Sequence, residues 1–166
     1  MRYHSVVLSI GLILAAWACT PRGLETYEAK DREETLIVSA LMRIPDGIKG
    51  RSVEMIMQPY AEDLYLGNFQ NYIGVAGPTA PLSLSKEDLR AAYVELLKSS
   101  KNISMKVMDF QLTVSGNRAT AEARTELVLK IDAPKREERQ QVFANEVLWR
   151  LRRTPAGWKI VEEIWR

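Results

Sequence analysis

The sequence predicts an α+β domain in which three helices from the first half of the chain cover one curved, mainly antiparallel sheet from the second half. Apolar residues recur at helical spacing before residue 100, whereas they alternate with polar residues in four runs between Lys101 and Arg166. The first of these runs changes parity midway, which a strand can do only through a bulge or bend that curls the sheet. The expected order is helix, helix, strand, strand, helix and four strands, arranged as a cone.

The composition fits one domain and excludes several classes of function. The chain has 166 residues, and its net charge of +2 comes from interspersed residues of both signs, so no nucleic-acid-binding surface is expected. Cys19 is the only cysteine, which rules out an internal disulfide. The only histidine, His4, lies within residues 1–18, which have the pattern of a removable leader. We therefore expect no metal site and no cofactor in the mature chain.

Residues 1–18 have the pattern of a signal peptide. Arg2 supplies the positive charge, and the uncharged apolar run that follows, from Val6 to Ala18, is shorter than the roughly 20 residues of a spanning helix. Small residues directly before Cys19 resemble the lipobox of bacterial lipoproteins, in which the cysteine is acylated and becomes the new N-terminus. An ordinary secretory leader cut nearby is the alternative.

The resemblance to lipoproteins also implies a location. Cys19 would attach the chain to the membrane, and residues 19–27 would form a tether to a folded domain over residues 28–166. Thr20, rather than an aspartate, follows the cysteine, and this favours the periplasmic face of the outer membrane over the inner membrane. Several acyl chains on one cysteine would anchor the domain stably.

The front half of the domain is expected to be helical. One helix is predicted from Glu25 to Ile44, where Pro45-Asp46-Gly47 would stop it, and a second is predicted from Ser52 to about Ala61. A third helix begins after Ser85, whose side chain can form a capping box with Asp88, and ends near Ser99. Residues 63–69 and 72–76 alternate enough to form a short strand pair between the second and third helices.

The back half alternates more regularly. The first long strand is predicted over Asn102 to Ser115, with its bulge near Val107-Met108, and the second over Arg118 to Asp132. The inward positions of the last two strands are then Phe143, Asn145, Val147, Trp149, Leu151, Trp158, Ile160 and Ile164. Charged residues of the same two strands are expected to form ion pairs on the outward face: Arg150, Arg152, Arg153, Glu162 and Glu163.

This order of elements resembles the nuclear transport factor 2-like superfamily over roughly Glu25 to Arg166. The most specific local matches are Pro59 to Asp63, at the expected end of the second helix, and Leu148 to Trp165 at the C-terminus. The family includes ketosteroid isomerases, dehydratases, epoxide hydrolases, polyketide cyclases and many non-catalytic binding modules. The resemblance therefore implies the cone fold and a pocket, and leaves the function open.

The catalytic pattern of ketosteroid isomerases is not retained at the matching positions. That chemistry needs a carboxylate base, and the position counted from Tyr60 is Asn68. The buried acid falls at Val147, and the tyrosine falls near Arg43 or Ile44. All three roles are vacant.

Other enzyme patterns of the superfamily are also weakly matched. The dehydratase pattern uses histidines, which the mature chain lacks. An epoxide hydrolase would need an Asp-Arg-Asp arrangement across the sheet, and the face with Arg124, Glu126 and Glu146 is a loose echo of it.

A set of polar and aromatic residues on the expected inner surfaces forms the candidate ligand pocket: Tyr60, Asp63, Asn68, Tyr72, Thr125, Asn145, Trp149 and Trp165. Asp63 could activate water, or it could satisfy backbone donors where the helix meets the strand. Thr125 and Asn145 break apolar rows, so they could bind a ligand or pair with each other or with buried backbone. The aromatic residues could line the pocket or belong to the core.

We therefore expect a lipid-anchored, non-catalytic domain of the cell envelope whose cone binds a small apolar ligand or an envelope protein. The alternative is a hydrolase, lyase or isomerase that uses Asp63 with Glu126 or Glu146. A homodimer through the sheet is a third hypothesis, although the outward charges between Arg118 and Lys130 weigh against it.

Overall fold

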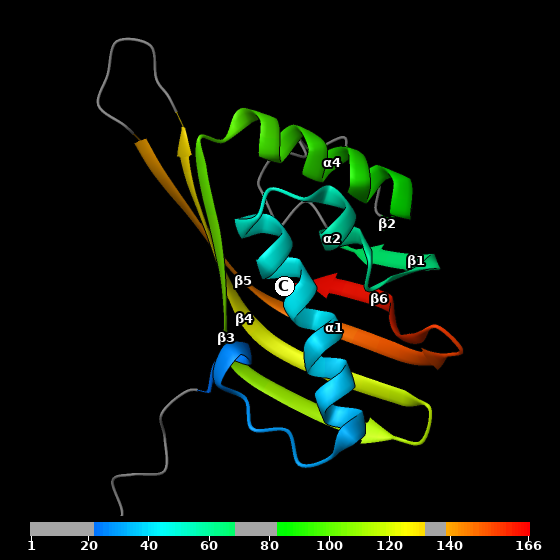
Figure 1. Ribbon diagram of the computed structural model, residues 1–166. Coiled ribbons are helices and arrows are strands. Elements are labelled where there is room, and N and C mark those ends of the chain that lie inside the picture. The colour runs from blue at the N-terminus through cyan, green and yellow to red at the C-terminus, as the bar shows by residue number, and fades with distance from the viewer. Residues whose placement is uncertain (1–21, 69–82, 132–138) are drawn as a thin grey trace, which may run out of the picture.

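The predicted α+β architecture is confirmed. The computed structural model describes residues 22–68, 83–131 and 139–166, and in it one curved sheet is covered on its concave face by the helices (Figure 1). The elements are η1 Leu24–Thr26, α1 Arg32–Lys49, α2 Val53–Met57, β1 Tyr60–Gly67, β2 Ser83–Leu84, α4 Lys86–Ser99, β3 Asn102–Ser115, β4 Arg118–Ile131, β5 Arg139–Thr154 and β6 Gly157–Trp165.

The sheet is mixed, with strand order β2-β1-β6-β5-β4-β3. The four C-terminal strands form an antiparallel meander, and β1 joins its last strand in parallel. β3 and the β1–β2 pair therefore form the two edges of the sheet. The long β3, β4 and β5 curve around α1, which lies across the middle of the concave face (Figure 1).

The bulge that the sequence predicts in β3 is present. The register against β4 slips between Met108 and Gln111, and Asp109 between them adopts a φ of 54°. Val107 and Phe110, which stand on opposite sides of a regular strand, are consequently both buried. The slip lies one or two residues beyond the predicted position.

α1 begins and ends later than predicted. Asp31 is its N-cap, because its Oδ1 accepts a hydrogen bond from the Glu34 backbone N–H at 2.8 Å. The helix then continues through Pro45 to Lys49. Proline removes one helical hydrogen bond, but Ile48 in the following turn is fully buried against the core, and this packing keeps the chain helical.

The short helix α2, Val53–Met57, begins where the sequence predicts but ends earlier than predicted. The Ser52 side chain caps α2 as expected, but the helix ends at Met57, and β1 already begins at Tyr60. Arg51, which precedes the cap, donates hydrogen bonds to the carbonyls of Leu97 and Ser100 and so ties this corner to the end of α4.

Two further predictions concern the start of α4 and the strand expected before it. The capping box of Ser85 and Asp88 at the start of α4 is confirmed. The strand expected at 72–76 lies outside the described residues, and β1 pairs with β2.

Part of the segment expected as a tether is packed against the sheet. The Arg22 carbonyl accepts a hydrogen bond from the Phe110 N–H at 3.0 Å, and Leu24 in η1 is buried. Tyr27 meets the Phe110 ring edge-on, with ring centroids 5.0 Å apart. The folded domain therefore begins by residue 22, at the β3 edge.

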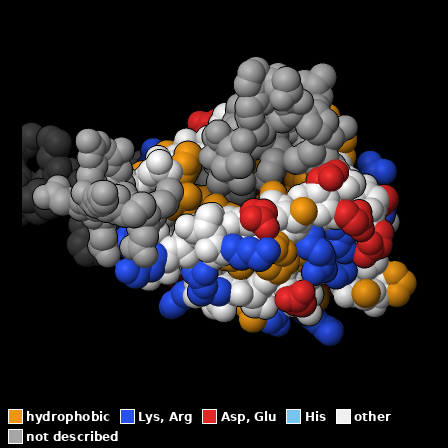
Figure 2. Space-filling view, turned by 90° about the horizontal axis from the view of Figure 1, so that it is seen from above, with side chains coloured by type: hydrophobic (Ala, Val, Ile, Leu, Met, Phe, Trp, Pro, Cys, Tyr) orange, Lys and Arg blue, Asp and Glu red, His pale blue; other side chains and the backbone are white. Residues whose placement is uncertain are grey.

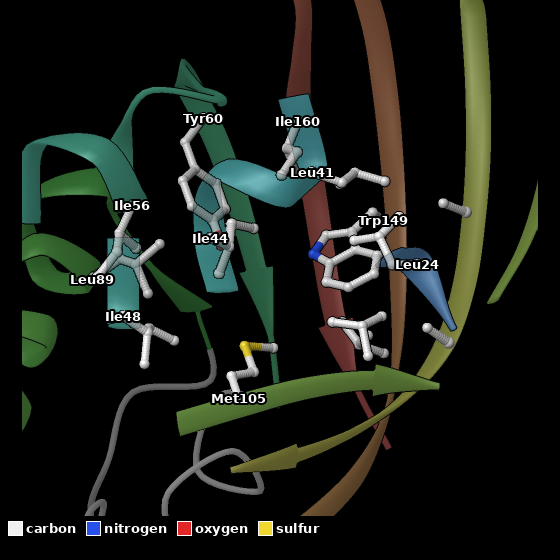
Figure 3. Packing of buried hydrophobic residues seen from close by; sticks show 14 of the residues in the cluster. Leu24, Leu41, Ile44, Ile48, Ile56, Tyr60, Leu89, Met105, Trp149 and Ile160 are labelled. Atoms are coloured by element: carbon white, nitrogen blue, oxygen red, sulfur yellow. The ribbon is translucent and has the colours of Figure 1, made fainter. Parts of the chain in front are cut away.

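The core fills the space between α1 and the sheet. Leu41, Ile44 and Ile48 of α1 lie in the same cluster as Tyr60 and Trp149 (Figure 3). Within the described segments, no helix is both long enough and apolar enough to cross a membrane.

Candidate functional site

A carboxyl group lies buried at the centre of the cone. Glu163 on β6 is fully inaccessible to solvent, and three aromatic side chains donate hydrogen bonds to it. Tyr60 Oη and Trp149 Nε1 both lie 2.7 Å from its Oε2, and Trp165 Nε1 lies 2.8 Å from its Oε1. We call these four residues the Glu163 cluster.

Three strands position this cluster. Trp149 of β5 stands directly opposite Glu163 in the register, and Tyr60 at the start of β1 pairs with Ile160 of β6. Figure 3 shows the Trp149 and Tyr60 rings among the helix residues of the core. The cluster thus lies in the packed interior.

Burial dominates the electrostatics of the site. It raises the pKa of Glu163, because a charged carboxylate loses its hydration there. The hydrogen bonds from Tyr60, Trp149 and Trp165 lower the pKa and only partly offset this effect. Because indole N–H groups only donate, both carboxyl oxygens are engaged as acceptors. The group is held by the protein and is not directed at open space.

The prediction that Glu163 lies on the outward face is wrong. The β5–β6 register shifts between Arg150 and Leu151, which pair with Glu162 and Ile160, so Val161 is an extra residue. This bulge reverses the parity of β6 and turns Glu163 inward.

The expected outward ion pairs form only in part. Arg150 pairs with Glu162 as predicted. Arg152 instead binds Asp63 through both carboxylate oxygens, and Arg153 pairs with Glu33 of α1.

The structure gathers only some of the predicted pocket residues. Tyr60, Trp149 and Trp165 belong to the Glu163 cluster, and Thr125 is buried on β4. The Thr125 hydroxyl donates to the Asn145 backbone carbonyl at 3.3 Å, so it satisfies a backbone group of the neighbouring strand. The Asn145 side chain is half-buried.

The remaining predicted residues do not join the Glu163 cluster. Asp63 is exposed, and its hydrogen bonds with Arg152 lower its pKa. Asn68 is exposed at the end of β1, with a φ of 55°. Tyr72 lies outside the described residues.

The carboxylates of the enzyme hypothesis are far apart. Asp63 is bound to Arg152 of β5. Glu146 lies six residues before Arg152 on β5, a separation of about 20 Å along the strand. Glu126 stands opposite Ala144, further still from Arg152. The structure therefore does not bring Asp63 to either glutamate.

An arrangement that partly resembles the Asp-Arg-Asp pattern of epoxide hydrolases lies on the outward face of the sheet. Arg124 stands opposite Glu146 and lies 3.6 Å from Asp109 at the β3 bulge. These three residues line an open depression of about 270 Å³. Both members of the Arg124–Asp109 pair are well exposed, so the arrangement lies outside the cone.

Comparison with known proteins identifies the fold. No protein-family model and no curated protein sequence matches the chain. Among solved structures, a protein from Kribbella flavida superposes with a TM-score of 0.67 at 14% identity, covering 80% of this chain and 88% of that one. A nuclear transport factor 2-like protein of unknown function from Pseudomonas putida gives 0.59 at 16% identity, covering 79% and 83%.

The chain has the nuclear transport factor 2-like fold. A Novosphingobium aromaticivorans protein provisionally described as a scytalone dehydratase also shares this fold, with a TM-score of 0.65 at 10% identity over 81% of this chain and 83% of that one. At these identities the comparisons establish the architecture alone. Val147, which the sequence comparison places at the position of the buried acid of ketosteroid isomerases, packs in the core of this nuclear transport factor 2-like domain.

The residue that sequence reasoning missed is Glu163. The sequence contains a partial signal, because its pattern predicts Trp165 in the pocket and Ile164 on the inward row. Adjacent residues cannot both point inward in a regular strand. The structure buries Trp165, whereas the prediction that Ile164 points inward is wrong: the bulge at Val161 puts Ile164 opposite Leu148, outside the core cluster.

Proposed function

We propose that this protein is a lipid-anchored, non-catalytic domain of the bacterial cell envelope that binds a small apolar molecule or a protein partner. The proposal rests on the burial of Glu163 and on the hydrogen bonds that its carboxyl group accepts. The acid at the centre of the cone is fully buried, and three donors from the protein occupy both of its oxygens. A general acid or base must come within hydrogen-bonding distance of its substrate, and this carboxyl group is enclosed by its own side chains.

The enzyme alternative has less support from the geometry. Its Asp63 is held by Arg152 at the surface, and the lowered pKa makes this carboxylate a weak base. Glu126 and Glu146 belong to the outward row of the sheet.

Of the two classes of occupant, the packed interior favours a protein partner. A small-molecule site needs a concave space that encloses most of the ligand. In this cone the large side chains of Tyr60, Trp149 and Trp165 are each about 1% exposed and belong to one cluster of buried residues. A protein partner can instead use the outer surface.

The lipid anchor rests on the leader and is tested through Cys19 and Thr20. We expect the full-length protein to incorporate an alkyne-labelled fatty acid and to sediment with outer membranes. Cys19→Ser should lose the label and appear in the soluble periplasmic fraction. The matched variant Thr20→Asp should keep the label and move to the inner membrane. Labelling of the Cys19→Ser protein would refute acylation at this residue.

Partner binding is tested by photocrosslinking in cells. The benzophenone amino acid p-benzoylphenylalanine is placed singly at the large hydrophobic residues that are exposed in the described segments: Leu36, Tyr65 and Val142. We expect a discrete protein adduct at one position and none at the other two. Absence of any adduct at all three positions, with anchoring intact, would contradict a partner-binding role.

A further inference from the structure

A groove follows the solvent-facing side of α1. Its first half is a depression of about 230 Å³, lined by Leu36 and Ala40 of α1, Pro59, and Trp158 at the start of β6. Leu36 is 39% exposed, so the groove presents an apolar side chain to solvent. The lining of this half contains no acidic residue among the described residues.

The groove continues between α1 and the start of α4. A second depression, of about 520 Å³, shares Arg43 and Gln58 with the first and adds Met55, Lys86 and Arg90. Both depressions are open to solvent along their length. Figure 2 looks onto the α4 end of the molecule, where Lys and Arg side chains lie among acidic and hydrophobic ones.

The groove is cationic. Its lining carries Arg43, Lys86, Arg90 and Lys159 against Glu54, and Glu62 beside the lining pairs with Lys86, so positive charge remains in excess. Charge of one sign along a groove attracts a ligand of the opposite sign and orients its approach. The complementary ligand therefore carries negative charge.

Arg43 differs from the other three cations. Lys86 binds Glu62 and the Tyr60 carbonyl, Arg90 binds Glu54, and Lys159 donates to the Gln58 carbonyl. The Arg43 guanidinium is exposed, and among the described residues it has no hydrogen-bond or ion-pair partner. It stands where the apolar and the cationic halves meet.

The groove lies away from the proposed anchor. Arg22 is hydrogen-bonded at the β3 edge, and only two residues separate it from Cys19, a reach of about 10 Å. The groove is lined by Pro59 beside β1, at the opposite edge of the sheet, and by α4. Anchoring at Cys19 would therefore place the β3 edge at the bilayer and the groove facing the periplasm.

We propose that this groove binds an acidic peptide segment of a protein partner. An apolar side chain of the segment packs on Leu36 and Ala40, and a carboxylate pairs with Arg43. An open groove with apolar and charged halves fits an extended or helical segment, whereas a small molecule would stay mostly exposed in it. This inference rests on the proposed partner-binding function and names its site and its ligand chemistry.

The test measures fluorescence anisotropy of a fluorescein-labelled synthetic peptide with a repeating Glu-Glu-Leu sequence. The protein is the full mature chain with Cys19→Ser. We expect binding that weakens with added salt, and no binding of the matching Lys-Lys-Leu peptide. Arg43→Glu should weaken the affinity at least about tenfold, because it replaces an attraction by a repulsion.

Arg118→Glu is the matched control. Arg118 is an exposed arginine on β4 whose side chain also has no hydrogen-bond or ion-pair partner among the described residues. The Arg118→Glu substitution should change the affinity for the acidic peptide by less than about twofold. Circular dichroism melting should show both variants folded. Equal losses in the two variants would mean attraction to overall charge and would overturn the groove as the site, as would no binding of the acidic peptide.

A membrane surface is the competing occupant. Vesicles of phosphatidylglycerol and phosphatidylethanolamine should not bind the Cys19→Ser chain in an Arg43-dependent way; if they do while the acidic peptide does not, the inference is wrong. The crosslinking experiment separates the two proposals. An adduct at Tyr65 or Val142 but not at Leu36 would overturn the groove and leave partner binding intact.

Discussion

Glu163 shows how one buried residue couples the interior to pH. Transfer of a carboxylate into an apolar interior is costly unless donors or cations compensate. Tyr60, Trp149 and Trp165 supply three neutral donors, yet the pKa of Glu163 is still raised above its ordinary value of 4.5. The folded protein therefore binds this proton more tightly than the unfolded chain does.

The sign of the resulting pH dependence follows from linkage. The stabilising contribution of protonated Glu163 is complete below the unfolded pKa of 4.5, and it is lost as the pH rises through the folded value. We predict that the free energy of unfolding of the wild type, minus that of Glu163→Gln, decreases as the pH rises from 4.5 toward the folded pKa. Urea unfolding at a series of pH values measures this difference.

The control for this experiment is Glu122→Gln. Glu122 is an acid on the outward face of β4 that is exposed to solvent. The corresponding difference for this variant should be flat over the same pH interval. A difference that rises with pH for Glu163→Gln would mean that the donors, and not burial, dominate the site.

At the scale of elements, the contact between α1 and α2 depends on one glycine. A Cβ atom on Gly47 would lie 2.6 Å from Ile56 Cγ1 and 2.7 Å from the Ile56 backbone nitrogen. Ile56 is fully buried, so neither its side chain nor its backbone can move without disturbing the core. The absence of a side chain at residue 47 permits α2 to pack closely on α1.

We predict that Gly47→Ala destabilises the fold by about 2–4 kcal/mol, as expected for overpacking that involves backbone. The double variant Gly47→Ala/Ile56→Val should not recover the loss, because valine keeps both γ carbons and the contact with the backbone nitrogen of residue 56 also remains. Thermal and urea unfolding measure both. Gly50→Ala, whose Cβ would lie 3.2 Å from the Asp46 carbonyl oxygen, should cost less than about 1 kcal/mol.

The elements that the sequence predicts well are those that local chemistry determines. The capping box at Ser85 involves residues three positions apart, and the parity switch in β3 is visible in consecutive residues. The passage of α1 through Pro45 depends instead on packing of the following turn against the core. The bulge at Val161 depends on how β6 pairs with β5, which no local pattern specifies.

The candidate site was partly predictable for the same reason. Tyr60, Trp149 and Trp165 are large aromatic residues on recognisable strands, so their inward placement could be expected. The acid that they bind follows a shifted register, and Asp63 finds Arg152, which is 89 residues away in the sequence. Such long-range pairs become visible only when the strands are assembled.

At the scale of the whole molecule, the sheet has two chemically different faces. Its concave face carries the core, and its outward face carries ion pairs such as Arg150–Glu162 and Arg152–Asp63. A homodimer through the sheet would have to remove these charges from water, which costs free energy unless the partner compensates.

We therefore predict that the mature Cys19→Ser chain is a monomer at micromolar concentrations in analytical ultracentrifugation. Arg152→Ala, which removes a charge from the outward face, should leave the sedimentation coefficient unchanged. A concentration-dependent dimer that dissociates in the Arg152→Ala variant would show that this face is an interface.

The three tryptophans of the domain share one feature with a practical consequence. Trp149 and Trp165 donate to Glu163, and Trp158 donates to Glu33 at 2.9 Å, whereas the fourth tryptophan of the chain, Trp17, lies outside the described residues. Every indole in the part of the chain that the structure describes is thus bonded to a carboxyl group. The intrinsic fluorescence of the protein is consequently an optical reporter of carboxyl ionisation, and it needs no introduced dye.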